Sequence, residues 1–384
     1  MLRPGHALML LMTSLLAIGV VTVHSAGVDL GSSQSFQFTD LLSTRVTIMA
    51  LLACATAWLA SHAPIELLSD ETVGRRIAFI LFTASMVLLL LVHVPGIGRE
   101  VNGARRWLTL GGLGFQPSEI AKWSMVIIMA WYVANRAETL QRYRTGFLPG
   151  LAISVMLILP IVTEDLGTAV LMGAVAVCML VAAGSRVLHA ASLLPLAVLG
   201  FVAAVLASSY RIDRIRAFLD PYADPGDTGY HILQSMASIS GGGLAGRGLG
   251  NSVQKFGYLP EDTTDFIFSV ISEELGIVGV LMVVGLLIGI LAVGLRIARR
   301  ATSIYHKVLV LGIMLTFGMQ ALINLLVVTG LAPTKGIALP LVSWGGTGWL
   351  MTSACLGLVW AVDRRNTLRS VDRSAPEIVP VGSE

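Results

Sequence analysis

Residues 267–295 read IFSVISEELGIVGVLMVVGLLIGILAVGL, an apolar run whose only charged residues are Glu273 and Glu274. A helix of about 20 apolar residues crosses the hydrocarbon core of a bilayer, so this run is long enough to span one. Nine further apolar runs, bounded by charged residues or by Gly and Pro, occur along the chain. The sequence therefore predicts an all-α polytopic membrane protein with ten transmembrane helices. They lie near 7–24, 44–62, 77–95, 119–135, 147–163, 168–184, 190–209, 267–295, 307–330 and 342–362.

The composition agrees with a membrane protein. The 384 residues are 55% hydrophobic and only 13% charged, whereas a soluble domain carries about 25% charged residues. This excludes a soluble enzyme, a disulfide module and a disordered scaffold, and leaves a transporter, a channel, a receptor or an enzyme that acts on lipid. The formal charge of +3 is too small to predict nucleic-acid binding. The three cysteines lie far apart in apolar runs, without the spacing of a zinc site.

The distribution of Lys and Arg predicts the orientation. With the N-terminus inside, most of these residues fall in the cytoplasmic connections, and both termini are cytoplasmic. Arg3 followed by an apolar run could also be a signal peptide. We interpret the run as an uncleaved first span, because ten spans are consistent with the charge distribution. Residues 1–366 are then one transmembrane domain, and residues 367–384 form a cytoplasmic tail expected to be disordered.

A long outer segment, from about residue 210 to residue 265, joins the seventh and eighth spans. It is rich in glycine, with Gly241, Gly242 and Gly243 in succession, interleaved with apolar residues. Irregular backbone at membrane depth is tolerated where protein shields it, so a re-entrant or interfacial segment fits this composition. The alternative is a solvated, flexible loop.

Ionisable residues at membrane depth are costly and are therefore candidate functional residues. In the stretch QPSEIAK, Glu119 and Lys122 are three residues apart and share one face of a helix, so they can form an ion pair. The pair would either line a polar cavity or only fasten the fourth span to its neighbours.

Two further acids lie at the outer membrane boundary. Asp165 belongs to the short connection after the fifth span, where it could help bind a cation or simply cap a helix. Asp265 lies at the outer mouth of the eighth span, next to the apolar Phe266. A carboxylate in that setting suits general acid/base catalysis, and helix capping is again the alternative.

Two loops carry residues that suit a phosphate-bearing or sugar-bearing lipid. Arg105, Arg106 and Trp107 combine guanidinium groups with an aromatic plate in one of them. Lys335 could contact an anionic headgroup in the other, which continues to Ser343 and a pair of glycines. An ordinary interfacial belt would use similar residues. The loops together predict an outward-facing site for an anionic lipid that contains sugar.

Six separate blocks resemble the SEDS family of polytopic cell-wall proteins, which includes FtsW, RodA and SpoVE. The resemblance covers nearly the whole chain, from the second span to the tenth. The block NSVQK, which ends in Lys255, and the following YLPE are more similar to the division member of the family than to the elongation member. The resemblance therefore favours the division branch. The six blocks are GARRW with QPSEIAK (103–122), DLG (165–167), GYHILQS (229–235), GLGNSVQK (248–255), YLPE with TDFIF (258–268), and PTKG with LPLVSWGG (333–346).

The resemblance implies a ten-helix glycosyltransferase that polymerises lipid II into β-1,4 glycan strands outside the bacterial cytoplasmic membrane, with undecaprenyl diphosphate as leaving group. Asp265 matches the catalytic acid of the family, and Glu119, Lys122 and Asp165 match positions that line its central cavity. The same resemblance implies no organic cofactor and leaves a divalent cation, Mg²⁺ or Mn²⁺, open, with Asp265, Asp165 and Glu119 as candidate ligands. It also implies a class B penicillin-binding protein, which is a transpeptidase, and divisome or elongasome proteins as partners. The residues assigned to the substrate or the cavity are Glu119, Lys122, Asp165, Arg105, Arg106, Trp107, Lys255, Lys335 and Ser343.

Three positions depart from the family pattern. Thr263 replaces a histidine, Glu164 replaces a proline, and Trp344 replaces a tyrosine. These departures leave other functions open, namely a lipid II flippase, an elongation-type polymerase, or a scaffold that recruits a transpeptidase. A transporter often shows inverted repeats, and the sequence contains no such repeat.

Overall fold

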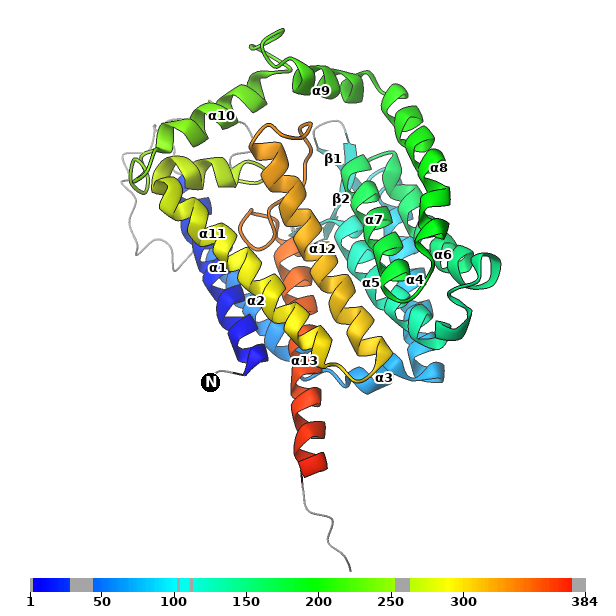
Figure 1. Cartoon of the computed structure of the whole chain (residues 1–384). Helices are drawn as coiled ribbons and strands as arrows, with labels where there is room; N and C mark the ends of the chain where they lie inside the picture. Colours follow the sequence, from blue (N-terminus) through cyan, green and yellow to red (C-terminus); the bar gives the residue numbers. More distant parts are fainter. Residues whose placement is uncertain (1–2, 28–43, 102–103, 111–112, 253–262, 375–384) are drawn as a thin grey trace, which may run out of the picture.

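A computed structural model describes residues 3–27, 44–101, 104–110, 113–252 and 263–374 of the chain. The protein is a bundle of long helices, crossed at one end by two shorter ones, α9 and α10 (Figure 1). We call this end the site end. The helices are α1 (Pro4–Ala26), α2 (Arg45–Ala60), α3 (Ile65–Ser69), α4 (Glu71–Leu91), α5 (Pro117–Asn135), α6 (Leu148–Val162), α7 (Leu166–Ala182), α8 (Val187–Leu206), α9 (Ser209–Leu219), α10 (Tyr230–Gly242), α11 (Ile267–Arg300), α12 (Ile304–Val328) and α13 (Thr347–Ser374). A 3-10 turn at Ala137–Thr139 and a π-helical turn at Tyr143–Phe147 precede α6.

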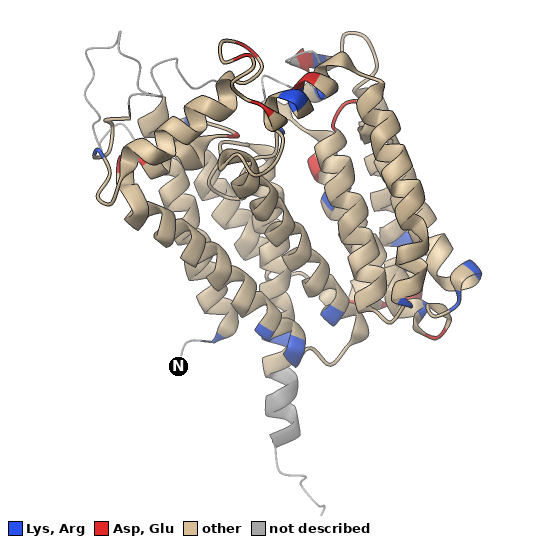
Figure 2. Ribbon diagram, turned by 45° about the horizontal axis from the view of Figure 1, so that its top comes forward, with Lys and Arg blue, Asp and Glu red and all other residues tan. Residues whose placement is uncertain are grey.

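A helix occupies each of the ten expected spans. Within the described residues, six helical segments are long and apolar enough to cross a bilayer, and α2 and α7 are apolar but shorter. The start of α1 and the end of α13 both lie at the end of the bundle opposite to α9 and α10 (Figure 1). Acidic and basic residues gather at the two ends, whereas the middle of the bundle is almost free of charge (Figure 2).

The all-α prediction was wrong for residues 98–115, which form a small antiparallel sheet. Strand β1 (Gly98–Val101) pairs with β2 (Ala104–Leu110), and β2 pairs with β3 (Leu113–Phe115). A bulge interrupts the register between Arg99 and Glu100. The segment is too polar and too short for a span, and neighbouring strands satisfy its backbone hydrogen bonds.

Helix α5 is the most enclosed of the spans, with neighbours α4, α7, α12 and α13. Its first turn starts with Pro117, whose missing N–H costs nothing at that position.

Small residues bring other helices close together. A Cβ added at Gly19 of α1 would lie 2.8 Å from the carbonyl oxygen of Leu341, so α1 packs directly on the backbone before α13.

Helix α11 is broken at Gly276, whose φ of 62° and ψ of −156° are not helical. Residues 243–248 dock onto this break. The N–H groups of Arg247 and Gly248 donate to the carbonyl oxygens of Glu273 and Glu274, at 2.9 Å in both cases. The N–H of Ile277 donates in turn to the carbonyl oxygen of Gly243. Backbone groups that the break would leave unpaired are therefore satisfied by the docked segment.

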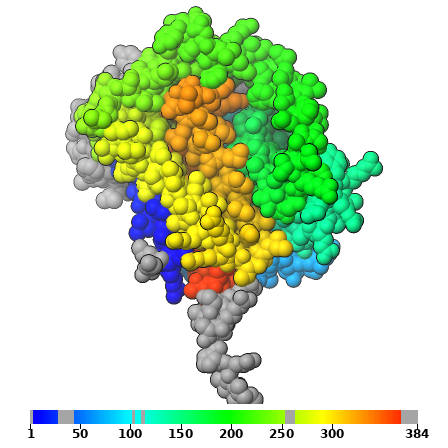
Figure 3. Space-filling model, viewed as in Figure 1, coloured from blue at the N-terminus to red at the C-terminus, as the bar shows by residue number. Residues whose placement is uncertain are grey.

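Side chains reinforce this docking. Glu273 is buried and forms an ion pair of 3.1 Å with Arg247, while its other oxygen accepts from Ser238 and Ser252. Both carboxylate oxygens of Glu274 accept from Ser25 of α1 at 2.8 Å. The segment from residue 210 to residue 265 thus contains α9 and α10, and residues 243–248 of it are attached to the bundle at the break in α11. The space-filling view shows α9 and α10 arching over the chain that follows α12 (Figure 3).

The last helix extends further than expected. It runs to Ser374, so the predicted domain boundary at residue 366 falls inside α13. Residues 375–384 lie outside the described part of the chain.

Candidate functional site

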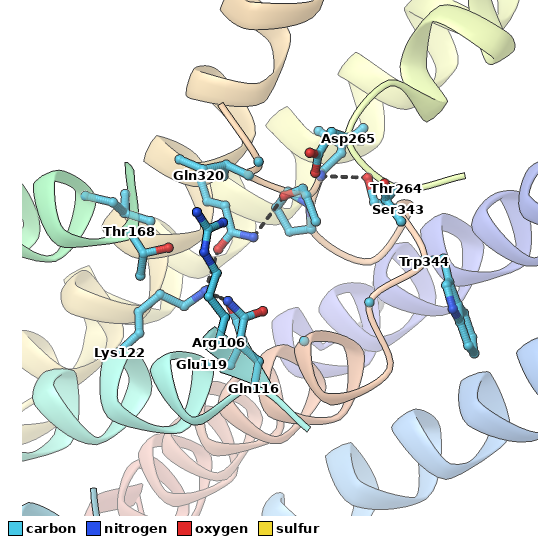
Figure 4. A pocket seen from close by; sticks show the side chains of 18 of the residues that line it. Arg106, Gln116, Glu119, Lys122, Thr168, Thr264, Asp265, Gln320, Ser343 and Trp344 are labelled. Carbon is cyan, nitrogen blue, oxygen red and sulfur yellow. Dashed lines mark hydrogen bonds and ion pairs between the residues drawn. The ribbon is translucent and has the colours of Figure 1, made fainter. Parts of the chain in front are cut away.

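A cavity of about 460 Å³ opens at the site end of the bundle (Figure 4). It is lined by residues from distant parts of the sequence, because α5, α9, α10, α12 and the segment before α13 all reach it. Of the predicted site residues, the cavity contains Arg106, Trp107, Glu119, Lys122, Asp265 and Ser343.

A chain of polar side chains forms the inner part of the cavity. Lys122 is only 1% exposed, and its Nζ donates to Glu119 Oε1 and to Gln320 Oε1, at 2.7 Å in both cases. Gln320 donates in turn to the carbonyl oxygen of Ala338. The other carboxylate oxygen of Glu119 is buried and accepts no hydrogen bond in the described structure. The predicted pair therefore exists, and it leaves one buried carboxylate oxygen without a hydrogen-bond partner among the described residues.

Asp265 lines the cavity and lies two residues before the first residue of α11, with Phe266 at the N-cap between them. Asn324 of α12 fixes its backbone by donating to the carbonyl oxygens of Asp265 and Ile337, at 2.8 Å in both cases. A Cβ added at Gly336 would lie 3.3 Å from Asp265 Oδ2 and 3.7 Å from Arg106 Nη1. The carboxylate and the guanidinium therefore both approach the bare backbone of Gly336.

Ser343 lines the cavity, but its hydroxyl is used within the chain. Its Oγ accepts from the N–H of Leu339 at 2.7 Å, and its carbonyl oxygen accepts from Trp349 Nε1. The neighbouring Trp344 N–H donates to the carbonyl oxygen of Thr263. These bonds shape the turn that closes one wall of the cavity, so Ser343 is placed to hold that wall.

Positive charge gathers beside Asp265. Arg214 of α9 lines the cavity, packs on the ring of Tyr210 and donates to the carbonyl oxygen of Thr334 at 2.9 Å. Burial lowers the pKa of the adjacent Lys335 below its ordinary value. Asp165 opposes that shift, whereas the guanidinium groups of Arg214, Arg211 and Arg106 add to it. A cluster of this kind is suited to an anionic group such as a diphosphate.

Two predicted residues lie behind the cavity wall. Asp165 caps α7 through hydrogen bonds to the N–H and hydroxyl of Thr168, at 3.0 and 2.8 Å. It faces a much smaller hollow together with Arg105. Arg105 is largely exposed and pairs with Glu100, while its backbone N–H donates to Glu164. Lys335 does not line the cavity but lies near its cationic residues, and Lys255 lies outside the described residues.

The described residues contain no preformed metal site. Among the described residues, no three His, Cys, Asp or Glu side chains come together to hold an ion. Glu119 is engaged with Lys122, and Asp165 with Thr168. The three carboxylates suggested as ligands therefore do not form a cage.

The residues of the cavity wall that the sequence analysis did not assign to the site include Gln320, Arg214, Tyr210 and His231. Gln320 is a polar residue inside an apolar span, which is a recognisable signal. The other three belong to α9 and α10, whose positions relative to the bundle could not be inferred from a segment treated as a loop.

Comparison with known proteins places these features in a family. A family model described as a cell cycle protein of the FtsW, RodA and SpoVE type matches residues 6–368. A probable peptidoglycan glycosyltransferase FtsW from a Geobacter species is 37% identical over 94% of this chain and 97% of its own. A chain of a solved peptidoglycan synthase complex, described as coordinating polymerization and crosslinking, is 28% identical with a TM-score of 0.73, covering 94% of this chain and 97% of its own. The rod shape determining protein RodA of Thermus thermophilus is 27% identical with a TM-score of 0.63, covering 94% and 96%.

Proposed function

This chain belongs to the FtsW, RodA and SpoVE family of cell cycle proteins, and we propose that it is a peptidoglycan glycosyltransferase that polymerises lipid II during cell division. The division role is supported by its 37% identity to a relative named FtsW, against 27% to RodA. The observation that carries the activity is the placement of Asp265 beside a cationic wall in a polar cavity.

The proposed reaction joins two lipid II units. The C4 hydroxyl oxygen of the acceptor sugar attacks the anomeric carbon of the donor as the bond from that carbon to the diphosphate oxygen breaks. Asp265 takes the hydroxyl proton, and undecaprenyl diphosphate leaves with the bonding electrons. Attack opposite to the leaving group inverts the anomeric carbon and gives a β-1,4 bond. A carboxylate within hydrogen-bond reach of the acceptor hydroxyl is suited to this step.

The leaving diphosphate gains negative charge as the glycosidic bond breaks. Arg106 and Arg214 line the cavity on the side of Asp265, and Lys335 adds charge from behind. Fixed cations directed at developing charge stabilise a transition state more than a ground state. We assign these three residues to the diphosphate of the donor.

The polar interior of the cavity has a different role in this proposal. Lys122, Glu119 and Gln320 connect α5 to α12 by short hydrogen bonds and keep a polar surface at membrane depth. The second oxygen of Glu119 is available there to accept a hydrogen bond from a sugar hydroxyl. The proposed reaction assigns no step to a divalent cation, since such an ion would need most of its ligands from the substrate diphosphate and water.

The proposed topology is supported by the distribution of Lys and Arg along the sequence and by the helices at the ten expected spans. All ten occupied spans cross the cytoplasmic membrane, with both termini in the cytoplasm and the site end outside. A class B penicillin-binding protein is the proposed partner, supported by the likeness to a chain of a synthase complex. Other divisome proteins would act through the same assembly.

The test is polymerisation of labelled lipid II by the purified protein, alone and with its cognate transpeptidase. Wild-type protein should make glycan chains, and Asp265→Asn should make none, whereas Glu138→Gln, an exposed change at the opposite end, should retain activity. Equal polymer yield from Asp265→Asn and wild type would overturn the mechanism. Movement of lipid II across vesicles without polymer would identify a flippase instead.

A further inference from the structure

His231 is a titratable residue of the cavity wall that the proposed reaction has not used. It lies on α10 and lines the same cavity as Asp265. Its ring stacks on Phe266, with centroids 5.9 Å apart and planes 21° apart, and meets the edge of Tyr230 at 6.4 Å. Phe266 directly follows Asp265 in the chain. The imidazole therefore contacts the residue that follows the proposed base, and both His231 and Asp265 line one cavity.

Each turnover leaves Asp265 with a proton that it must lose before the next one. A carboxyl group has an ordinary pKa of about 4, and an imidazole one of about 6.5, so transfer from acid to neutral imidazole is favourable near pH 7. His231 lines the cavity and is partly exposed. A group in that position can receive a proton from the cavity and release it to water.

The other charged residues that line the cavity are less suited to this task. Arg106 and Arg214 carry guanidinium groups, which donate hydrogen bonds and have no acceptor atom for a proton. Lys122 and Glu119 are bound to each other in the inner part of the cavity. Within the described wall, His231 is the residue whose ordinary pKa lies closest to neutrality.

We propose that His231 is the proton acceptor that regenerates Asp265 after each glycosyl transfer. The proton moves from the acceptor hydroxyl to the Asp265 carboxylate, from that carboxyl group to the neutral imidazole, and from the imidazolium to water. No group is oxidised or reduced, and both side chains return to their starting protonation states. This role rests on the proposed glycosyltransferase function and adds a second proton-transfer residue to it.

The first test is the pH profile of lipid II polymerisation by His231→Gln. Wild-type kcat should fall on the acidic side as the His231 imidazole becomes protonated. The variant should lose that acidic limb, and its kcat at pH 7.5 should fall by about tenfold or more with little change in KM. His189→Gln is the matched control, because its imidazole also packs on aromatic rings, Tyr143 and Phe147, but lies outside the cavity.

A chemical rescue separates the proposed role from a structural one. Added imidazole should restore polymerisation by His231→Ala and should leave Asp265→Asn inactive. If His231→Gln keeps the wild-type kcat and acidic limb, the proposal is wrong while the glycosyltransferase function stands. If wild type makes no polymer, the glycosyltransferase function itself is wrong.

A further measurement does not depend on activity or on the folding of a His231 variant. NMR titration of histidine-labelled protein, with His231 assigned by difference, should show its pKa falling when Asp265 becomes Asn, because a neighbouring negative charge is removed. An unchanged pKa would show that the two groups do not interact and would overturn the proposal.

Discussion

Gly336 lies against the carboxylate of Asp265, so that even a methyl group added there would stand 3.3 Å from Oδ2. We therefore expect Gly336→Ala to lower kcat for polymerisation several-fold and Gly336→Val to abolish it, since each added group displaces the base or its substrate. Rates measured with labelled lipid II check this. Gly226→Ala, where a Cβ meets no atom within 4 Å, is the control. Full activity in Gly336→Val would show that substrate does not approach this face of Asp265.

The buried ion pair in the cavity gives a prediction about stability. Lys122→Met removes the cation from the partly exposed Glu119 carboxylate, and breaking such a pair costs about 3 kcal/mol. Thermal denaturation in detergent should show a lower midpoint for this variant. The double variant Glu119→Gln with Lys122→Met should recover most of the midpoint without recovering polymerisation. A double variant as unstable as the single one would contradict the assigned pairing.

The pKa of Lys335 predicts a change in substrate binding with pH. Burial and the nearby Arg214, Arg211 and Arg106 lower this pKa, so the ammonium loses its charge at a lower pH than an ordinary lysine. KM for lipid II should therefore rise as the pH increases through the lowered pKa. Lys335→Arg should remove this alkaline rise, because guanidinium stays charged. The same alkaline rise in Lys335→Arg would exclude Lys335 as its source.

The break in α11 gives a prediction about the docked segment. Gly276 has a positive φ, and a Cβ there would stand 2.5 Å from the backbone nitrogen of Gly246. Gly276→Ala should cost about 2 kcal/mol or more in conformational strain, with the backbone clash added to it. Limited proteolysis should then cleave the segment around Gly246 faster than in wild type. Gly285 lies nine residues further along the same helix, and a Cβ there would meet no atom within 4 Å, so Gly285→Ala should not change the cleavage rate.

Much of the helical bundle could be predicted from the sequence, because apolar length is a strong signal. The pairing of Glu119 with Lys122 was also predictable, since it depends on spacing within one helix. The sheet at residues 98–115 and the break at Gly276 were not predicted, because both depend on hydrogen bonds to partners that the local sequence does not identify.

The candidate site was predicted less evenly. Asp265 and Arg106 were identified, and the structure brings both to one cavity. Asp165 was considered either as a ligand residue or as a cap, and the structure shows the cap. His231 and Arg214 were missed, because they reach the cavity only through the path of α9 and α10 across the bundle.

The connections of Lys122 also bear on how the protein is made. Its contact with Gln320 spans 198 residues, so during synthesis Lys122 enters the membrane long before that partner exists. Glu119, one helical turn earlier, is present from the start and can neutralise the ammonium at once. Glu119 is therefore the partner that Lys122 has until α12, which carries Gln320, has been synthesised.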